Sequence, residues 1–128
     1  FCRLAKMASA KLDAIPHVDI DKDGVFKYIL IKATMEAEDG KKDKLLVRGY
    51  ARAQWHADIF DEVQQKVAAL GVEMKCLGGG RIDHDAKNKK IKVYGYSQGF
   101  GKADHKKSVE LLKKQYPDYE ICWSDDGY

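Results

Sequence analysis

The strongest constraint on the fold comes from residues 25–31, a run rich in the β-branched and aromatic side chains that are typical of a β-strand. A strand with one face in water alternates apolar and polar side chains, whereas this run is apolar almost throughout. Such a strand needs apolar partners on both of its faces. The run therefore predicts the central strand of a sheet that is packed between helices.

Two further segments have the spacing of helices. The first begins near Ala57, carries acidic residues in its first turns, where the helix dipole favours them, and ends at Gly71. Its apolar face is formed by Ile59, Val63, Val67 and Leu70. The second helix is expected over residues 104–115, with Pro117 just beyond its end.

The remaining patterns predict short strands and turns. Residues 8–24 are interpreted as a leading segment and a turn, and the polar residues 36–44 as a loop. Strands are expected over residues 25–31, 45–50, 73–76, 81–84, 90–96 and 119–123. Together these elements predict the α+β class, as a single compact domain in which a mixed β-sheet of about six strands is packed by two main helices.

Length and composition fit one domain. The chain has 128 residues, of which 45% are apolar, enough to form a core and too many for a disordered chain. Met7 resembles an initiator methionine, so we assign the domain to residues 7–128 and interpret residues 1–6 as a leader or as expression-derived residues.

Charge and cysteine content exclude several classes of protein. Lysine and arginine number 23 and acids 20, too even a balance for a dedicated nucleic-acid binder. No stretch approaches the roughly 20 uncharged apolar residues of a membrane helix, so we expect neither nucleic acid nor membrane as a partner. Three scattered cysteines, at positions 2, 76 and 122, predict free thiols in a reducing compartment, and hence a cytoplasmic protein.

Two motifs resemble known ligand-binding loops without completing them. Residues 19–24 place acids at positions 1, 3 and 5 of a calcium loop, but position 12 is Leu30 and a strand follows, so we interpret them as a turn. Residues 95–102 resemble a phosphate loop, but they are one residue too long and Ala103 replaces the magnesium-binding Ser or Thr. This glycine-rich turn can still offer backbone N–H groups to an anion, or it is an ordinary tight connection.

The glycines at 78–80 and the four histidines carry weaker signals. Three consecutive glycines predict a flexible hairpin or close packing, although the adjacent Arg81 could reach a phosphate. No histidine pair or cysteine has the spacing of metal ligands, so we expect no metal. His84 and His105 are interpreted as solvated surface or as part of a partly buried face.

His56 and Lys27 are each compatible with two roles. His56 stands where the first helix begins, and the positive end of the helix dipole would keep its ring neutral, as a base or nucleophile requires. A histidine there also caps or packs without chemistry, which is the commoner role. Lys27 lies on an apolar side of the central strand, where it either snorkels to solvent or is held for an anion.

Many separate segments, in the right order, resemble the protein phosphohistidine phosphatase (Janus) family. They cover nearly everything after Met7, and together they are more specific than any single glycine motif. The segments are Ile15-Pro16, Val18-Asp19-Ile20-Asp21, Gly24-Val25-Phe26-Lys27-Tyr28, Val47-Arg48-Gly49-Tyr50, His56-Ala57-Asp58-Ile59, Cys76-Leu77-Gly78-Gly79-Gly80-Arg81-Ile82, Val93-Tyr94-Gly95-Tyr96-Ser97, Tyr116-Pro117-Asp118-Tyr119 and Asp126-Gly127-Tyr128.

The resemblance implies a small phosphatase that needs no metal or other cofactor and acts on phosphohistidine-containing proteins. The family's catalytic histidine corresponds to His56 and its phosphate-binding lysine to Lys27. Its phosphate-cradling loop corresponds to Ser97, Gln98 and Gly99, and its nearby arginine to Arg81. Where the family commonly has Lys-Trp after Gly-Tyr, this chain has Ala51-Arg52, a departure that bears on substrate preference.

The residue types suit hydrolysis of a P–N bond, which is labile once its nitrogen is protonated. Catalysis then requires positioning and charge neutralisation, with His56 acting as general base or as nucleophile. The alternative is a non-catalytic module that binds phosphate or phosphoproteins at the same anion site. Nucleic-acid binding through the lysines of residues 87–92 and 102–114 is disfavoured because acids interrupt the second segment. We expect a monomer.

Overall fold

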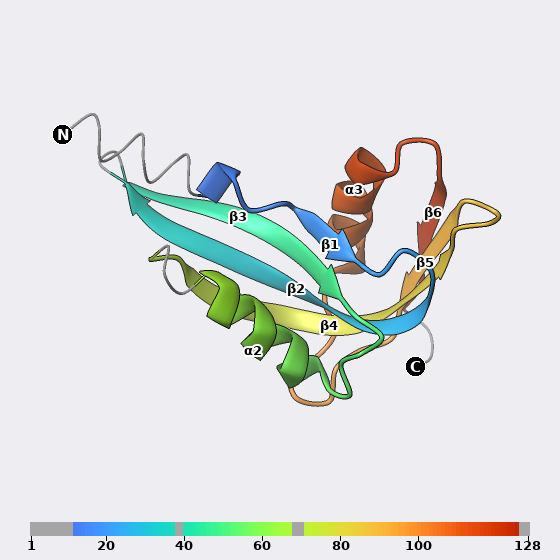
Figure 1. Cartoon of the computed structure of the whole chain (residues 1–128), viewed down its shortest axis with the longest axis horizontal. Coiled ribbons are helices and arrows are strands. Elements are labelled where there is room, and N and C mark those ends of the chain that lie inside the picture. Colours follow the sequence, from blue (N-terminus) through green and yellow to red (C-terminus); the bar gives the residue numbers. More distant parts are fainter. Residues whose placement is uncertain (1–11, 38–39, 68–70, 126–128) are drawn as a thin grey trace.

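The computed structural model describes residues 12–37, 40–67 and 71–125, which form one mixed sheet with a helix on each face (Figure 1). The sheet runs in the order β1-β3-β2-β4-β5-β6, with β1–β3 and β5–β6 parallel and the other pairs antiparallel. This confirms the α+β prediction. The elements are β1 (Val18–Ile20), β2 (Gly24–Ala37), β3 (Gly40–Gly49), α2 (His56–Val67), β4 (Glu73–Asp85), β5 (Lys90–Tyr94), α3 (His105–Gln115) and β6 (Glu120–Trp123).

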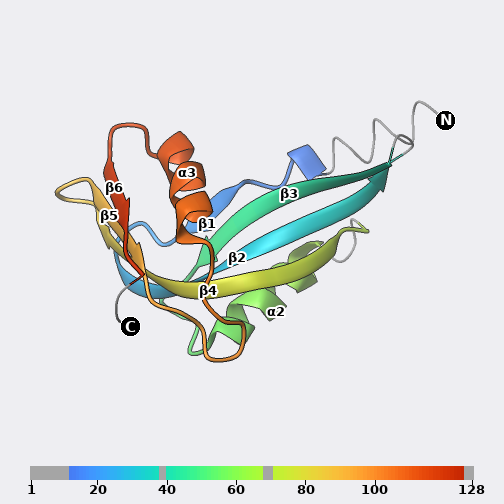
Figure 2. The same cartoon turned by 180° about the vertical axis from the view of Figure 1, so that it is seen from behind.

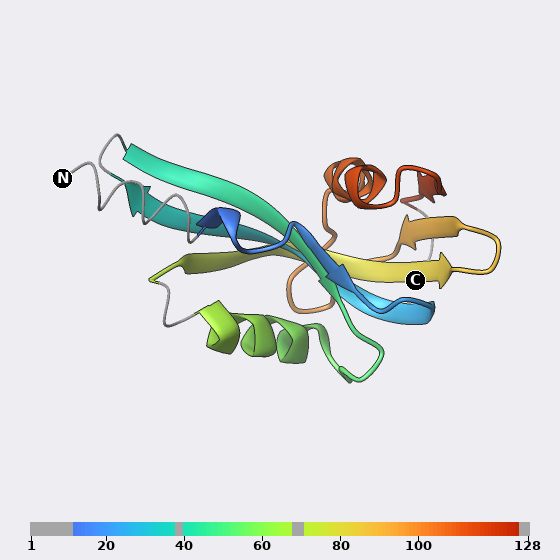
Figure 3. The same ribbon diagram turned by 45° about the horizontal axis from the view of Figure 1, so that its top comes forward.

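The central strand β2 is covered on both faces, as its apolar run predicts (Figure 3). Ile29 and Ile31 face α2 and belong to one apolar cluster, together with Ile59 of that helix. Tyr28 and Leu30 point to the opposite side and pack in a second cluster with residues of α3. Two helices on opposite faces therefore bury the alternating side chains of one strand.

The predicted loop over residues 36–44 is wrong, because the described part of this segment continues the β2–β3 hairpin. Polar cross-strand pairs stabilise this exposed arm. The Thr34 hydroxyl donates a hydrogen bond to Asp43 over 2.9 Å, and Lys32 forms an ion pair with the same carboxylate at 3.4 Å. The β3 strand of this arm is polar over residues 40–44 and lacks the apolar alternation that a sequence pattern can detect.

The glycines at 78–80 do not form the hairpin turn that separates two predicted strands; β4 runs through them without interruption. The alternative prediction of close packing is confirmed. A Cβ on Gly78 would lie 2.6 Å from the backbone nitrogen of Ala103, and one on Gly79 would lie 2.7 Å from the His56 ring. Other segments thus contact the sheet closely at this triplet.

The acidic residues 19–23 belong to β1 and the turn after it, and their carboxylates act separately. Asp19 accepts a hydrogen bond from Tyr50, Asp21 from the N–H of Ala51, and Asp23 from the N–H of Ala86. The turn prediction is confirmed, whereas the strand β1 within the leading segment was not predicted. Its three residues are too short to show a pattern, and they are held by parallel pairing with β3.

Both predicted helices are present, and their starts are within one residue of the predicted positions. The first helix begins at His56, one residue before the predicted start, and the second begins at His105. Leu70, the assignment of residues 1–6 and the matching segment 126–128 lie outside the described residues. No helix in the described ranges is long and apolar enough to cross a membrane.

Candidate active site

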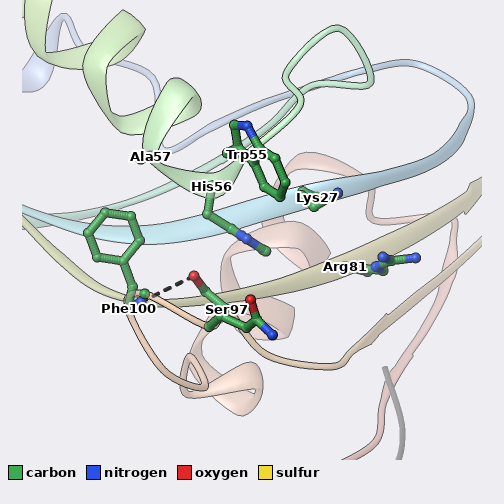
Figure 4. A pocket seen from close by; sticks show the side chains of 9 residues that line it. Lys27, Trp55, His56, Ala57, Arg81, Ser97 and Phe100 are labelled. Carbon is green, nitrogen blue, oxygen red and sulfur yellow. Dashed lines mark hydrogen bonds between the residues drawn. The ribbon is translucent and has the colours of Figure 1, made fainter.

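One pocket brings together all six residues predicted for catalysis or phosphate binding (Figure 4). They come from four parts of the chain: β2, the start of α2, β4 and the segment between β5 and α3. That last segment passes β4 beside the start of α2, as Figure 2 shows from behind. The pocket is lined by Lys27, Trp55, His56, Ala57, Arg81, Ser97, Gln98, Gly99 and Phe100.

The His56 ring lies at the base of this pocket, 6% exposed, with its orientation fixed by the backbone of β4. Its Nε2 lies 2.9 Å from the carbonyl oxygen of Gly80. A carbonyl only accepts hydrogen bonds, so Nε2 carries the proton and Nδ1 keeps its lone pair. Within the described residues Nδ1 has no hydrogen-bond partner, and this nitrogen is therefore open to a ligand in the pocket.

The surroundings of His56 keep its ring neutral. Burial lowers the pKa of His56 below its ordinary value, the Gly80 carbonyl partly opposes this, and the positive charges of Lys27 and Arg81 lower it further. The start of α2 adds the positive end of a helix dipole at the same place. At neutral pH the ring can thus accept a proton or act as a nucleophile.

Lys27 and Arg81 form a cross-strand pair of like charges on the pocket face of the sheet. The two residues are directly opposite each other in the β2–β4 register. Like charges in that position repel and destabilise a sheet. None of the residues that line the pocket is acidic, so the two cations face a pocket that suits an anion.

The segment after β5 is a hydrogen-bonded turn with backbone donors at its tip. Ser97 and Gly101 exchange two backbone hydrogen bonds, of 3.0 and 2.8 Å, and the Ser97 hydroxyl accepts one from the N–H of Phe100 at 3.2 Å (Figure 4). The turn is tied to β4 by the N–H of Gly79, which donates to the carbonyl of Gly101 over 2.9 Å. Across the described chain, the N–H groups of Gln98 and Gly99 have no protein acceptor, and they are available to an oxyanion.

The interpretation of this turn as a tight connection that needs glycine is confirmed at two positions. Gly95 and Gly101 have φ values of 76° and 84°, so the turn itself needs them. Gly99 has no such conformation, and a Cβ built there would meet nothing within 4 Å. Neither the backbone conformation nor packing against a neighbour therefore requires a glycine at position 99.

Sequence reasoning missed two aromatic residues that complete the pocket, Trp55 and Phe100. Trp55 immediately precedes α2, and its N–H donates to the carboxylate of Asp58 over 2.9 Å. This is one half of a capping box, and the acid three residues after Trp55 was its signal in the sequence. Phe100 packs against Phe60 of α2, with ring centroids 5.9 Å apart.

The interpretation of His84 and His105 as solvated or partly buried is wrong, because both are only 2% exposed. His84 donates from Nδ1 to the carbonyl of Asp21 over 2.8 Å. His105 donates from Nε2 to the carbonyl of Gly95 over 2.8 Å. Aromatic neighbours from distant parts of the chain enclose both rings, and the sequence alone did not indicate this.

The chemistry available at the site is the capture of an oxyanion beside a neutral imidazole. Two cations, two unused amides and the first turn of α2 offer positive charge and donors, while His56 offers a lone pair. Among the described residues, no group of three His, Cys, Asp or Glu side chains could hold a metal ion.

Comparison with known proteins relates nearly the whole chain to one family. The profile of the Janus/Ocnus family (Ocnus) matches residues 12–120. The chain is 51% identical over 124 residues to the 14 kDa phosphohistidine phosphatase of Sus scrofa, covering 94% of this chain and 98% of that protein. It is 50% identical over 125 residues to the protein of the same name from Homo sapiens, covering 95% and 100%. It is also 51% identical over 127 residues to the sex-regulated protein janus-A of Drosophila pseudoobscura pseudoobscura, covering 98% and 85%.

Proposed function

The chain belongs to the Janus/Ocnus family, and from that premise we propose that it is a phosphatase that hydrolyses the P–N bond of phosphohistidine in proteins. The single observation that carries this proposal is the neutral His56 ring, which faces a pocket of cations and amide donors with Nδ1 open. A site that only bound phosphate would need the donors but not the base.

In the proposed reaction, water adds to phosphorus, the P–N bond breaks, and the substrate imidazole leaves with a proton on its nitrogen. The products are inorganic phosphate and an unmodified histidine. Nδ1 of His56 either takes the proton from the attacking water or takes the phosphoryl group itself, in which case water releases it in a second step. The open lone pair supports both routes.

The other pocket residues bind and neutralise the phosphoryl group. We assign charge stabilisation to Lys27 and Arg81, and hydrogen bonding to Ser97 and to the amides of Gln98 and Gly99. The positions of these groups support the assignment, because hydrogen bonds tie the turn to β4 and the two cations lie on neighbouring strands. Preorganised donors stabilise transition-state charge without the cost of reorienting water.

Release of inorganic phosphate from a phosphohistidine peptide tests the proposal. The wild-type protein should release phosphate, and His56→Ala should not. A wild-type protein that binds the peptide without releasing phosphate would favour the alternative, a non-catalytic phosphoprotein-binding module at the same site.

We also propose that the reaction needs no metal ion. A pocket with two cations and several N–H donors already supplies the positive charge that a divalent ion would otherwise provide. Saturating EDTA should leave the rate of phosphate release unchanged. Loss of activity that a divalent ion restores would contradict this proposal.

Finally, we propose that residues 7–128 act as one domain, as a cytoplasmic monomer on phosphohistidine-containing proteins. Support comes from the single sheet that joins the described elements and from the free thiols of Cys76 and Cys122. Burial raises the pKa of the Cys76 thiol to about 11, so this thiol is protonated and unreactive at neutral pH. Sedimentation equilibrium should give the mass of one chain.

A further inference from the structure

The pocket has a buried polar base and an exposed aromatic rim. His56 and Ser97 are 6% and 2% exposed, whereas Trp55, which also lines the pocket, is 59% exposed. Trp55 is the most exposed large apolar side chain in the described chain. Covering an exposed indole with another flat ring is favourable, because it removes apolar surface from water and allows the rings to stack.

Trp55 is held in place although its ring is exposed. Its backbone N–H donates to Asp58, and its carbonyl accepts from the N–H of Asp58 over 3.1 Å, so both backbone groups are tied to the first turn of α2. Figure 4 shows the indole beside His56, over the pocket that Lys27 also enters. A ring attached to such a fixed point can contact a ligand at little cost in backbone entropy.

The shape of the substrate determines which of its parts meets the rim. A phosphohistidine side chain is attached to a protein backbone that remains outside the pocket, so its phosphoryl group enters first. The cations and amides around His56 bind that group at the base. The imidazole ring, one bond behind the phosphorus, then follows on the side of the rim, where the exposed Trp55 lies.

We propose that Trp55 stacks on the imidazole ring of the phosphohistidine substrate and makes the site selective for an aromatic leaving group. This inference rests on the proposed function and names a specificity-determining residue for it. Stacking between flat rings favours an aromatic leaving group over an aliphatic amine of similar charge.

The same contact assists the bond cleavage. The P–N bond breaks once the imidazole is protonated, so the leaving ring carries positive charge at that step. Lys27 and Arg81 at the base repel such a charge, whereas the face of an indole attracts it. Trp55 thus supplies attraction at the point where the leaving group separates from the bound phosphoryl group.

Substitutions at this one position separate stacking from simple apolar contact. With a phosphohistidine peptide, Trp55→Ala and Trp55→Leu should both lower kcat/KM about fivefold, and Trp55→Phe should restore most of it. Since Trp55 is exposed, all three variants should fold, which the thermal melting temperature checks. Trp123→Ala is the matched control, because Trp123 is 43% exposed on β6 and lines no part of this pocket.

A pair of non-hydrolysable ligands tests the contact without the reaction. Wild-type protein should bind phenylphosphonate about fivefold more tightly than methylphosphonate, as measured by calorimetry, and Trp55→Ala should bind the two equally. Equal binding by the wild type, or an unchanged preference in Trp55→Ala, would overturn the proposal. An equal loss for both ligands would overturn it too, since Trp55 would then support only the phosphate site.

Different results would contradict the role of Trp55 and the proposed function. A wild-type protein that releases no phosphate from the peptide would contradict the proposed function, whatever the phosphonates do. A wild-type protein that releases phosphate at a rate unaffected by Trp55→Ala and Trp55→Leu would contradict only the role of Trp55.

Discussion

Two buried histidines, His56 and His105, are held alike on opposite faces of the glycine triplet of β4. Each donates from Nε2 to a backbone carbonyl, His56 to Gly80 over 2.9 Å and His105 to Gly95 over 2.8 Å. Burial is the main cause that lowers the pKa of both. By exposure, tautomer and pKa direction they are hardly distinguishable.

What separates them is the neighbour of Nδ1. In His105 this nitrogen accepts a hydrogen bond from the hydroxyl of Tyr28 over 2.5 Å, and that hydroxyl is also within 3.1 Å of the Ser108 hydroxyl. In His56 the same nitrogen faces the pocket. A histidine with both ring nitrogens hydrogen-bonded contributes to stability, whereas one with a nitrogen open to the pocket is available for chemistry. The histidine on one face of the sheet is therefore structural and the one on the other face is reactive.

The largest expected difference between the two histidines is in turnover. His56→Ala should lower kcat by about 10²–10⁴-fold, the usual contribution of a general base, and by more if His56 is the nucleophile. The fold should remain intact, because the removed ring lies at the base of an open pocket, from which water can reach the Gly80 carbonyl. Phosphate release and circular dichroism measure the two effects.

The matched control for that variant is His17→Ala, since His17 is exposed and does not line the pocket. It should retain the wild-type rate. A folded His56→Ala protein with a near wild-type rate would remove His56 from the mechanism.

The second-largest loss of activity is expected for Lys27→Ala. Lys27→Ala should raise KM and lower kcat/KM by the equivalent of about 1–3 kcal/mol, the range for a charged hydrogen bond. It should also weaken inhibition by inorganic phosphate. Thermal stability should not fall, because removal of Lys27 ends its repulsion with Arg81 across the strands. Unchanged KM and unchanged phosphate inhibition would show that Lys27 only snorkels to solvent.

On the opposite face, the same logic predicts a change in stability and not in activity. Tyr28→Phe leaves Nδ1 of His105 without its donor in a fully buried place. The free energy of unfolding should fall by about 1–3 kcal/mol, the cost of an unsatisfied buried group, in urea denaturation. The rate of phosphate release should stay close to that of the wild type. A large loss of turnover with unchanged stability would reverse the division between the two faces.

Ser97→Ala should have the smallest effect on the pocket. The backbone N–H groups of Gln98 and Gly99 remain in place, and Ser97 and Gly101 still exchange their two backbone hydrogen bonds. We expect KM to rise only about two- to fivefold, the value of one neutral hydrogen bond. A loss as large as that of Lys27→Ala would show that the hydroxyl, and not the amides, binds the phosphoryl group.

The acid limb of the rate profile should report the charges around His56. Only the neutral ring can act, so kcat/KM should fall as pH drops through the pKa of His56, which lies below its ordinary value. Burial is the first cause and remains in Lys27→Ala, but one positive neighbour is lost. The acid limb of that variant should therefore move to higher pH. A shift to lower pH would contradict the proposed electrostatics.

The sequence predicted those features that follow from short-range patterns. The apolar run of β2 indicated cover on both faces, and helical spacing located both helices. The far end of the β2–β3 hairpin escaped prediction because residues 40–44 of β3 are polar and show no apolar alternation, although they pair with β2. The sequence left the glycines at 78–80 between a hairpin and close packing, because the segments that pack on them lie far away along the chain.

The candidate site residues were predictable only through the resemblance to a family, because position alone left His56 and Lys27 with two roles each. No sequence pattern identifies the hydrogen-bond partners of the ring nitrogens of His56 and His105. The carbonyls of Gly80 and Gly95 and the hydroxyl of Tyr28 reach the two histidines through the folded sheet. Which histidine has an Nδ1 without a hydrogen-bond partner in the described residues could therefore be learned only from the structure.

The most direct test of this distinction is ¹⁵N NMR of the histidine rings at neutral pH, with and without methylphosphonate. Both His56 and His105 should carry their proton on Nε2 in the free protein, and only the Nδ1 signal of His56 should change when the ligand binds. A proton on Nδ1 of His56 in the free protein would contradict the central claim. So would a ligand that shifts the Nδ1 signals of both rings equally.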